Sequence, residues 1–397
     1  MGNSIIRLAV LGSTGSVGEQ TLDVVRALPG RFQVVALAAG GNVARLREQI
    51  AEFRPAAAWA LPGIEASALA AELGSDAWQS MEAMAARPDI DVVLVATSGI
   101  AGLAPTLAAL GAGKPVALAN KEVLVVGGHA VRAALDRGGS LRPVDSEHSA
   151  IWQCLWGEAP ESVARITLTA SGGAFRDYDL DRLAQVTPAE ALQHPTWRMG
   201  PKVTIDSATL FNKGMEAIEA RWLFDLPMDR IDVLQHRESV VHSLVTFTDG
   251  SVKAQLGEPD MRLPIQCALT YPDRAAQPAI APLDLAARGA LHFGAVDTAR
   301  FPALAIAIEA GRRDDTTAAA LSGADEVAVA RFLAGGCTFT DIAHVLGTAL
   351  EQHRPQHEPS LPQLLAAEAW GRACAETTLN DLRHTDRGHT DPALKGQ

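Results

Sequence analysis

The sequence predicts an α/β protein with an N-terminal domain on a doubly wound parallel sheet, a central α/β domain and a C-terminal helical domain. Apolar strand-length segments alternate with helix-period segments up to Asp145, which is the pattern of a parallel sheet. The alternation stops near Ala150, and residues 304–383 show helical periodicity. The 397 residues, 48% of them hydrophobic, are enough for two or three cores.

The N-terminal domain is assigned to residues 1–145. Its predicted strands occupy residues 8–11, 34–38, 56–61, 92–96, 116–119 and 141–144. The uncharged residues 92–113 have the length of a membrane span, but Ser98, Gly99 and Pro105 divide them into a strand, a turn and a helix. We therefore predict no transmembrane segment.

The central domain is assigned to residues 146–270. A Trp-bearing helix is predicted at residues 151–156, and strands at residues 165–169, 233–235, 240–248 and 251–255. Asp249-Gly250 is a strong hairpin signal between the last two strands, so a mixed sheet is expected. The Pro- and Ala-rich residues 271–303 are interpreted as a linker, and residues 304–397 as the helical domain with a polar, frayed end from His384.

Charge and cysteine content exclude several classes of partner. Acidic residues outnumber basic ones by 46 to 34, for a net charge of -12, so neither nucleic acid nor an anionic membrane is an expected partner. The four cysteines lie far apart without a Cys-x-x-Cys pair, which argues against a zinc knuckle or a disulfide framework. With no signal-peptide pattern at the start, a reducing cytoplasm is the expected location.

A glycine-rich turn follows the first strand, with the sequence Gly12-Ser13-Thr14-Gly15-Ser16-Val17-Gly18. Glycines let the backbone approach a pyrophosphate, whose charge then meets the amides of the following helix, so a Rossmann-like dinucleotide site is predicted. The second strand ends in Ala39-Gly40-Gly41-Asn42 without the carboxylate that NAD enzymes use, which favours NADPH. Arg45 or Arg47 could approach a 2′-phosphate, or both could lie on a solvated helix face.

The densest acidic cluster, Asp145-Ser146-Glu147-His148, is predicted at the carboxyl end of a strand, where open α/β sheets bind ligands. Residues two apart on an extended chain point the same way, so Asp145 and Glu147 could share one cation. Carboxylate oxygens select Mg²⁺ or Mn²⁺ over zinc. The alternative is a solvated strand end, and His148 is better explained as a residue behind such a site or in the core.

A second polar cluster begins at Asp206 and leads into a predicted helix. Ser207, Asn212 and Lys213 supply the hydroxyl, amide and ammonium donors that a phosphomonoester needs. Glu216 and Glu219 lie one helical turn apart, so either could complete the cation site. A capped helix with charged residues facing water is the alternative.

Two further segments fit the same phosphate site. Ser171-Gly172-Gly173 could add hydroxyl and amide donors, although a Gly pair often marks only a turn. Residues 194–200 form a predicted loop that could act as a lid, or could simply pack Trp197 against the domain.

Together with Asn120-Lys121-Glu122 and residues 256–262, these motifs resemble the 1-deoxy-D-xylulose 5-phosphate reductoisomerases in order and spacing, over nearly the whole chain. The resemblance implies a Mg²⁺ or Mn²⁺ ion on Asp145, Glu147 and Glu216. It also implies that these three residues and Lys121 carry catalysis. The implied substrate contacts are Lys121, Ser146, Glu147, Ser171, His194, Ser207, Asn212, Lys213 and Glu216, with Trp197 and Met199 on a lid. The implied NADPH contacts are Thr14, Gly15, Ser16, Val17, Gly40, Gly41, Asn42, Asn120, Glu122 and Gly200.

The activity that this resemblance implies is an isomerisation of 1-deoxyxylulose 5-phosphate, by retro-aldol cleavage and re-aldol joining, followed by reduction with NADPH to 2-C-methylerythritol 4-phosphate. That reaction belongs to the non-mevalonate route to isoprenoid precursors, and a homodimer is expected. Gly41 departs from the family pattern, in which a basic residue is common there, and Val123 replaces a common serine.

The sequence leaves two rival functions open. An NADP-dependent semialdehyde dehydrogenase would need a catalytic thiol, and Cys154 is the only cysteine near the predicted site; its apolar setting indicates an inert thiol instead. A non-catalytic NADPH sensor would bind the cofactor without needing the acidic residues.

Overall fold

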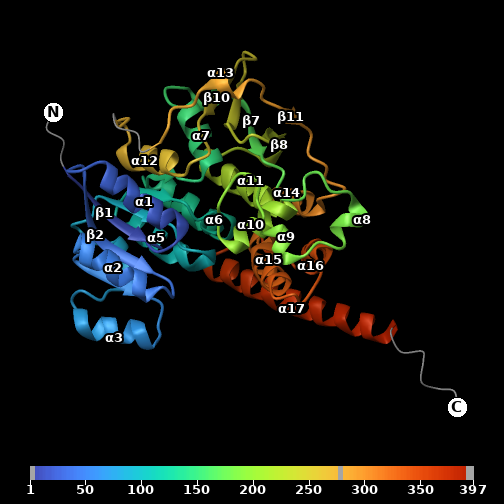
Figure 1. Cartoon of the computed structure of the whole chain (residues 1–397), viewed down its shortest axis with the longest axis horizontal. Helices are drawn as coiled ribbons and strands as arrows, with labels where there is room; N and C mark the ends of the chain where they lie inside the picture. The colour runs from blue at the N-terminus through green and yellow to red at the C-terminus, as the bar shows by residue number, and fades with distance from the viewer. Residues whose placement is uncertain (1–4, 276–279, 390–397) are drawn as a thin grey trace.

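Six parallel strands in the order β3-β2-β1-β4-β5-β6 form the N-terminal sheet of the computed structural model, which describes residues 5–275 and 280–389 (Figure 1). Each strand lies within two residues of its predicted bounds, and the parallel α/β fold is confirmed. The order reverses between β1 and β4, and the crevice at such a point is where open sheets bind ligands. The strands are β1 Ile6–Leu11, β2 Phe32–Ala39, β3 Ala57–Ala60, β4 Val92–Val95, β5 Val116–Leu118 and β6 Leu141–Pro143.

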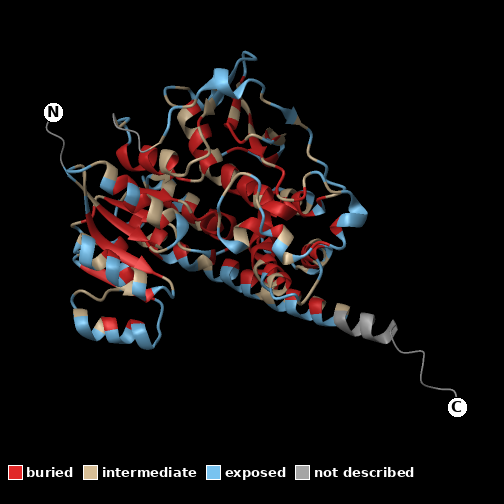
Figure 2. Ribbon diagram, in the orientation of Figure 1, coloured by how far each residue is buried: buried red, intermediate tan, exposed pale blue. Residues whose placement is uncertain are grey.

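Helices cover this sheet on both sides, and the strands between them are buried along almost their whole length (Figure 2). Such two-sided burial explains why the strands are continuous apolar runs rather than alternating ones. The helices of this part are α1 Ser16–Ala27, α2 Val43–Phe53, α3 Ile64–Leu73, α4 Met81–Ala85, α5 Leu103–Gly111 and α6 Glu122–Asp136.

A second sheet has the order β10-β9-β7-β8-β11 and mixes directions, which confirms the predicted mixed sheet. The hairpin turn lies where predicted, with Gly250 at φ +86° between β9 and β10. The segment interpreted as a linker also contributes to the sheet, because β11 within it pairs with β8 and forms the edge strand. The strands are β7 Val163–Ala170, β8 Ile231–His236, β9 Val241–Phe247, β10 Val252–Leu256 and β11 Phe293–Gly294.

The helices of the central part correct one prediction. Asp145 follows the carboxyl end of β6, as predicted, but the chain is not extended there: Asp145 is the N-cap of α7, so Ser146, Glu147 and His148 lie in the first helical turn. The helical pattern after Asp206 is broken at Leu210, which has φ +61° between α10 and α11. The helices here are α7 Ser146–Cys154, α8 Leu180–Leu183, α9 Pro188–Ala191, α10 Pro201–Thr209, α11 Phe211–Phe224, α12 Arg262–Thr270 and α13 Leu285–Arg288.

The C-terminal helices are α14 Pro302–Arg313, α15 Thr317–Leu333, α16 Phe339–Gln352 and α17 Leu361–His389. Helix α17 continues through the segment expected to fray from His384, while residues 390–397 lie outside the described part. Gly371 lets α17 approach α15 closely, since a Cβ there would lie 1.9 Å from the Ala320 carbonyl oxygen. Among the described residues, no helix is both long and apolar enough to cross a membrane.

Candidate active site

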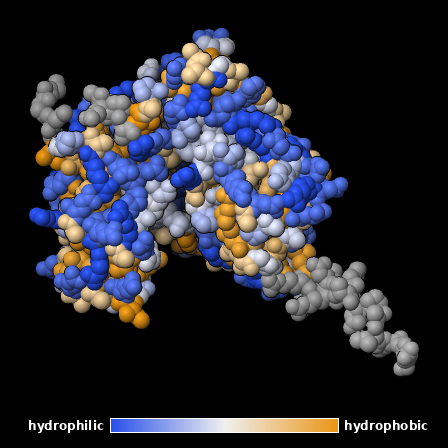
Figure 3. All heavy atoms as spheres, in the orientation of Figure 1, coloured by the Kyte–Doolittle hydropathy of each residue, from blue (hydrophilic) through white to orange (hydrophobic). Residues whose placement is uncertain are grey.

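A cavity of about 1110 Å³, including space open to solvent, is lined by residues of the N-terminal and central domains. A cleft separates these two parts on the face drawn in Figure 3. The predicted site residues that line the cavity are Ser16, Val17, Lys121, Asp145, Ser146, Glu147, Ser171, His194, Trp197, Met199, Gly200, Ser207, Asn212, Lys213 and Glu216. The predicted cofactor residues Thr14, Gly15, Gly40, Gly41, Asn42, Asn120 and Glu122 lie outside its lining.

Three carboxylates converge in this cavity from two helices. Oxygens of Asp145, Glu147 and Glu216 all lie within 4.8 Å of one another. Asp145 and Glu147 come from the start of α7, and Glu216 from the second turn of α11. The pair Asp145 and Glu147 is therefore brought together by a helix N-terminus, not by the extended chain that the sequence suggested.

Two lysines hold these carboxylates in place. Lys121 Nζ lies 2.9 Å from Asp145 Oδ2 and 3.2 Å from Glu216 Oε1. Lys213 Nζ lies 2.6 Å from Glu147 Oε1 and also pairs with Glu216. Three negative charges thus face two positive ones in a largely dry site, which leaves an excess negative charge.

Burial and neighbouring charge perturb this group strongly. Burial and the repulsion of Glu147 raise the pKa of Glu216, although both lysines oppose this. Burial also acts to raise the pKa of Asp145, but the attraction of Lys121 and His148 outweighs it and the pKa is lowered. An uncompensated buried carboxylate beside two others is a setting that a cation would stabilise, and hard oxygen donors suit Mg²⁺ or Mn²⁺. The residues present therefore fit a divalent ion.

Two of the polar donors predicted for a phosphate, Asn212 and Lys213, lie among the carboxylates: the Asn212 amide donates to Glu216 Oε1 at 2.5 Å, and Lys213 pairs with Glu147 and Glu216. The other two, Ser171 and Ser207, line the same cavity. Gly173 brings its segment against α10, since its φ is +70° and a Cβ there would lie 2.4 Å from the Ser207 carbonyl oxygen. Ser171 Oγ lies 3.0 Å from His194 Nε2, and His194 Nδ1 accepts the N–H groups of Thr196 and Trp197 at 3.1 and 2.9 Å. This network assigns the ring hydrogen to Nε2, which donates to Ser171.

The glycine-rich turn has the local geometry of an anion site. A Cβ on Gly12, at φ +94°, would lie 2.3 Å from the Ala96 carbonyl oxygen, and one on Gly18 would lie 2.2 Å from the Gly12 carbonyl oxygen. Gly15 is not crowded in this way, and it is the N-cap of α1 without a side-chain cap among the described residues. Gly12 and Gly18 are needed to fold the turn, whereas Gly15 leaves the helix amides open to a ligand.

The two arginines considered for a 2′-phosphate are both in ion pairs. Arg45 Nε lies 2.7 Å from Glu19 Oε1, and its guanidinium also contacts Glu48, while Arg47 Nη1 lies 2.5 Å from Glu72 Oε2. Gly41 is exposed, and a Cβ there would meet no atom within 4 Å.

The predicted cofactor residues around Lys121 have clear structural partners. The Asn120 amide donates to the carbonyl oxygens of Thr97 and Gly99 at 2.6 and 2.8 Å, and its Oδ1 accepts the Val123 N–H. Glu122 is buried, 3.6 Å from Lys202 Nζ. Both residues therefore also fix the turn that carries Lys121.

Several residues that line the cavity were not predicted. Ser239, at φ +52°, precedes β9, and His242 lies on β9 with its ring centroid 6.3 Å from that of Trp197. Burial lowers the pKa of His242 to about 4. In the sequence, His242 is a single histidine in a mostly apolar predicted strand, and no motif around it indicates a site. Cys154, by contrast, is outside the cavity lining, and burial raises the pKa of its thiol, which removes the support for a thiol enzyme.

Known proteins match this chain over nearly its whole length. Family models described as 1-deoxy-D-xylulose 5-phosphate reductoisomerase, its C-terminal domain and DXP reductoisomerase C-terminal domain match residues 8–128, 141–224 and 256–374. The 1-deoxy-D-xylulose 5-phosphate reductoisomerase of Thermomicrobium roseum is 51% identical over 382 residues, covering 95% of this chain and 99% of that protein. The Heliobacterium modesticaldum enzyme of the same name is 49% identical over 392 residues, covering 96% and 99%.

Solved structures agree with the sequence comparison. A DOX-P reductoisomerase in complex with NADPH, fosmidomycin and magnesium superposes with a TM-score of 0.88 at 37% identity, covering 96% of this chain and 99% of that one. The Zymomonas mobilis 1-deoxy-D-xylulose 5-phosphate reductoisomerase in complex with NADPH gives a TM-score of 0.87 at 38% identity, covering 95% and 99%.

Proposed function

The chain belongs to the 1-deoxy-D-xylulose 5-phosphate reductoisomerase family, and from this premise we propose how its cavity performs the family's reaction. The protein is an NADPH-dependent oxidoreductase that converts 1-deoxy-D-xylulose 5-phosphate to 2-C-methyl-D-erythritol 4-phosphate. The observation that carries the assignment of this reaction to the cavity is the convergence of Asp145, Glu147 and Glu216 beside Lys121. Neither a thiol nor a purely cofactor-binding role accounts for that cluster.

Asp145, Glu147 and Glu216 would hold the divalent ion. When bound, Mg²⁺ or Mn²⁺ supplies positive charge that binds substrate oxygens and offsets the negative charge that forms on them. Lys121 lies at the edge of this group and would present its ammonium to the same developing charge. Ser146, next to Asp145 and hydrogen-bonded to Glu147 at 2.6 Å, would contact a substrate hydroxyl.

The phosphate of the substrate would be bound by Ser171, Ser207, Asn212 and Lys213, with His194 donating from Nε2. These are neutral donors and one ammonium, which complement a phosphomonoester in a dry pocket. Residues 194–200 run directly from His194 to the start of α10, so phosphate contacts would also hold this loop over the cavity. Binding energy from the remote phosphate is then available to close the loop and exclude water from the reacting carbons.

NADPH would lie on the turn of Thr14, Gly15, Ser16 and Val17, with its pyrophosphate facing the open amides of α1. When bound, it supplies the hydride for the reduction. The remaining proposed contacts are Gly40, Gly41 and Asn42 after β2, Asn120 and Glu122 beside Lys121, and Gly200 at the end of the loop. Gly200 and Val17 line the same cavity as the carboxylates, which supports a cofactor and substrate in one chamber.

The decisive assay follows the absorbance of NADPH with 1-deoxyxylulose 5-phosphate and Mg²⁺ or Mn²⁺, then with excess EDTA. We expect oxidation that stops with EDTA, returns with metal and fails in Asp145→Asn and Glu216→Gln. NADPH binding without turnover under any metal condition would instead establish the sensor, whose function Glu216→Gln would leave intact.

We further propose that the chain acts as a cytoplasmic homodimer in the non-mevalonate route to isoprenoid precursors. We also propose the domain division 1–145, 146–270, 271–303 and 304–397. The acidic composition and separated cysteines support the compartment, and family membership supports the dimer and the route. Sedimentation equilibrium of the purified chain tests the dimer.

A further inference from the structure

Glu219, one of the two glutamates that the sequence offered as cation ligands, lies behind the cavity rather than in it. Its side chain is fully buried on α11, one turn after Glu216, and it does not line the cavity. Neither of its carboxyl oxygens has a hydrogen-bond partner among the described residues. Burying a carboxyl without a hydrogen-bond partner costs free energy, so the groups that surround Glu219 indicate what its burial is for.

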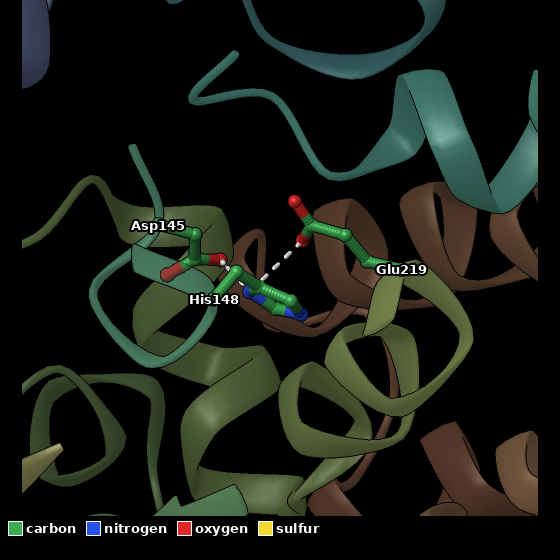
Figure 4. Close-up of side chains that lie close together, drawn as sticks. All are labelled: Asp145, His148 and Glu219. Atoms are coloured by element: carbon green, nitrogen blue, oxygen red, sulfur yellow. Dashed lines mark ion pairs between the residues drawn. The ribbon is translucent and has the colours of Figure 1, made fainter. Parts of the chain in front are cut away.

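Glu219 faces His148, as Figure 4 shows. Glu219 Oε2 lies 3.6 Å from His148 Nδ1, and Asp145 Oδ2 lies 3.9 Å from the same nitrogen. The imidazole is fully buried, and its ring lies nearly parallel to that of Phe224, with centroids 6.4 Å apart. At 3.6 Å the pair is longer than a hydrogen bond, and only a small movement separates the Glu219 carboxyl from donating to Nδ1.

The other ring nitrogen of His148 reaches the backbone of a cation carboxylate. His148 Nε2 lies 2.8 Å from the Glu216 carbonyl oxygen and donates to it. His148 stands in the first turn of α7, next to Glu147, while Glu216 and Glu219 stand on α11. The imidazole therefore joins the two helices that bring the three carboxylates together, and Glu219 faces its remaining nitrogen.

We propose that Glu219 is a positioning residue for the divalent-cation site, acting through His148 to fix the N-terminus of α7 against α11. This inference rests on the proposed ligands Asp145, Glu147 and Glu216. Side chains behind metal ligands commonly change metal affinity by about 10–100-fold when removed. A rigid spacing matters here because the carboxylates repel one another whenever the ion is absent.

The test is Mn²⁺ binding to the whole chain without substrate or NADPH, measured by the electron paramagnetic resonance of free Mn²⁺. In Glu219→Ala we expect the Kd to rise at least about tenfold. In Glu219→Gln, whose amide can donate to His148 Nδ1, we expect a Kd within about threefold of wild type. The effect of Glu219→Ala should vanish in a His148→Asn background, since the two residues act in series.

Glu368→Ala is the matched control, because Glu368 is a buried glutamate on α17 that pairs with Arg372, away from the cavity. It should lower the melting temperature without changing the Mn²⁺ affinity. Unchanged Mn²⁺ affinity in Glu219→Ala, or an equal loss in Glu368→Ala, would overturn the inference and leave the proposed cation site standing. Failure of the wild type to bind Mn²⁺ would overturn both. If Glu219→Ala does not fold, the Glu219→Gln and His148→Asn variants decide, with weaker binding expected only in the second.

Discussion

Lys121 Nζ lies 2.9 Å from Asp145 Oδ2, so an internal cation already sits beside the proposed metal site. We predict that Lys121→Met lowers kcat by about 10²–10³-fold, the usual cost of removing one donor that faces developing charge. Mn²⁺ binding should not weaken, because Lys121 competes with the ion for the same carboxylates. Steady-state kinetics and Mn²⁺ titration separate the two effects. Loss of metal affinity in the variant would show that Lys121 acts by building the site instead.

Two glycines of the cofactor turn, Gly12 and Gly15, should respond differently to alanine. Gly12→Ala places a Cβ against the Ala96 backbone at a positive φ, so we expect a loss of at least about 2 kcal/mol in unfolding free energy. Gly15→Ala meets no such clash and should keep the wild-type melting temperature while raising the NADPH Kd about tenfold. Urea unfolding and NADPH fluorescence measure these quantities. Equal losses of unfolding free energy in the two variants would contradict the assignment of Gly12 to folding and Gly15 to cofactor binding.

The N-terminal sheet was predictable because its first five strands contain short apolar runs bounded by turn residues, and two-sided burial makes such runs unambiguous. The predictions for two other features were wrong, each for a physical reason. The segment after Val144 has polar residues that suit either a strand end or a helix N-terminus, and packing of α7 under the second sheet decides for the helix. Strand β11 is two residues long, and only its partner β8 makes it a strand.

The candidate site was predictable where its residues stand in local motifs, as Asp145, Ser146 and Glu147 do. His242 was missed because β9 carries it into the cavity without any recognisable motif around it on the strand. Helical spacing alone left the choice between Glu216 and Glu219 open, since both lie on one helix face, and the family resemblance chose Glu216. Only the rotation of α11 decides which carboxyl opens to the cavity and which turns to His148.

Gly41 offers a test of cofactor selection. A side chain at this exposed position meets open space, and the nearby Arg45 is held by Glu19. We predict that Gly41→Arg tightens NADPH binding about tenfold, as a charge-assisted bond to a 2′-phosphate would, and leaves NADH binding unchanged. Cofactor fluorescence titrations measure both. Gly63→Arg, at another open glycine, is the control; equal tightening there would indicate only a general charge effect.

The histidine on β9 should make stability depend on pH. Burial lowers the pKa of His242 from its usual 6.5 to about 4, so the folded state favours the neutral ring. Its contribution is fully present above pH 6.5 and is lost as the pH falls toward 4, up to about 3 kcal/mol. Urea unfolding of wild type and His242→Gln across that window should give a flatter pH dependence for the variant. If the unfolding free energies of the two proteins change with pH in parallel, His242 is not the source of the pH dependence.

Lys202 anchors the end of the loop over the cavity to both flanking domains. Its Nζ lies 2.8 Å from Asp206 Oδ2 and 2.9 Å from Asp325 Oδ2, and both aspartates are fully buried. Glu122, at 3.6 Å, adds a third carboxylate from the turn that carries Lys121. One ammonium therefore compensates three acidic groups on α6, α10 and α15. An uncharged side chain at position 202 would leave all three without a cation.

We predict that Lys202→Met lowers the unfolding free energy by about 3–5 kcal/mol, because it leaves buried carboxylates without their cation. Burial and Asp325 raise the pKa of Asp206, so the favourable contribution of that carboxyl exists at low pH and is lost as the pH rises through its folded value. The variant should therefore lose more stability at about pH 8 than at about pH 5.

Lys202→Met combined with Asp206→Asn should recover part of the loss, since one buried charge is removed. Urea unfolding of the single and double variants at both pH values measures this, and a double variant less stable than the single one would show that Asp206 has a different partner.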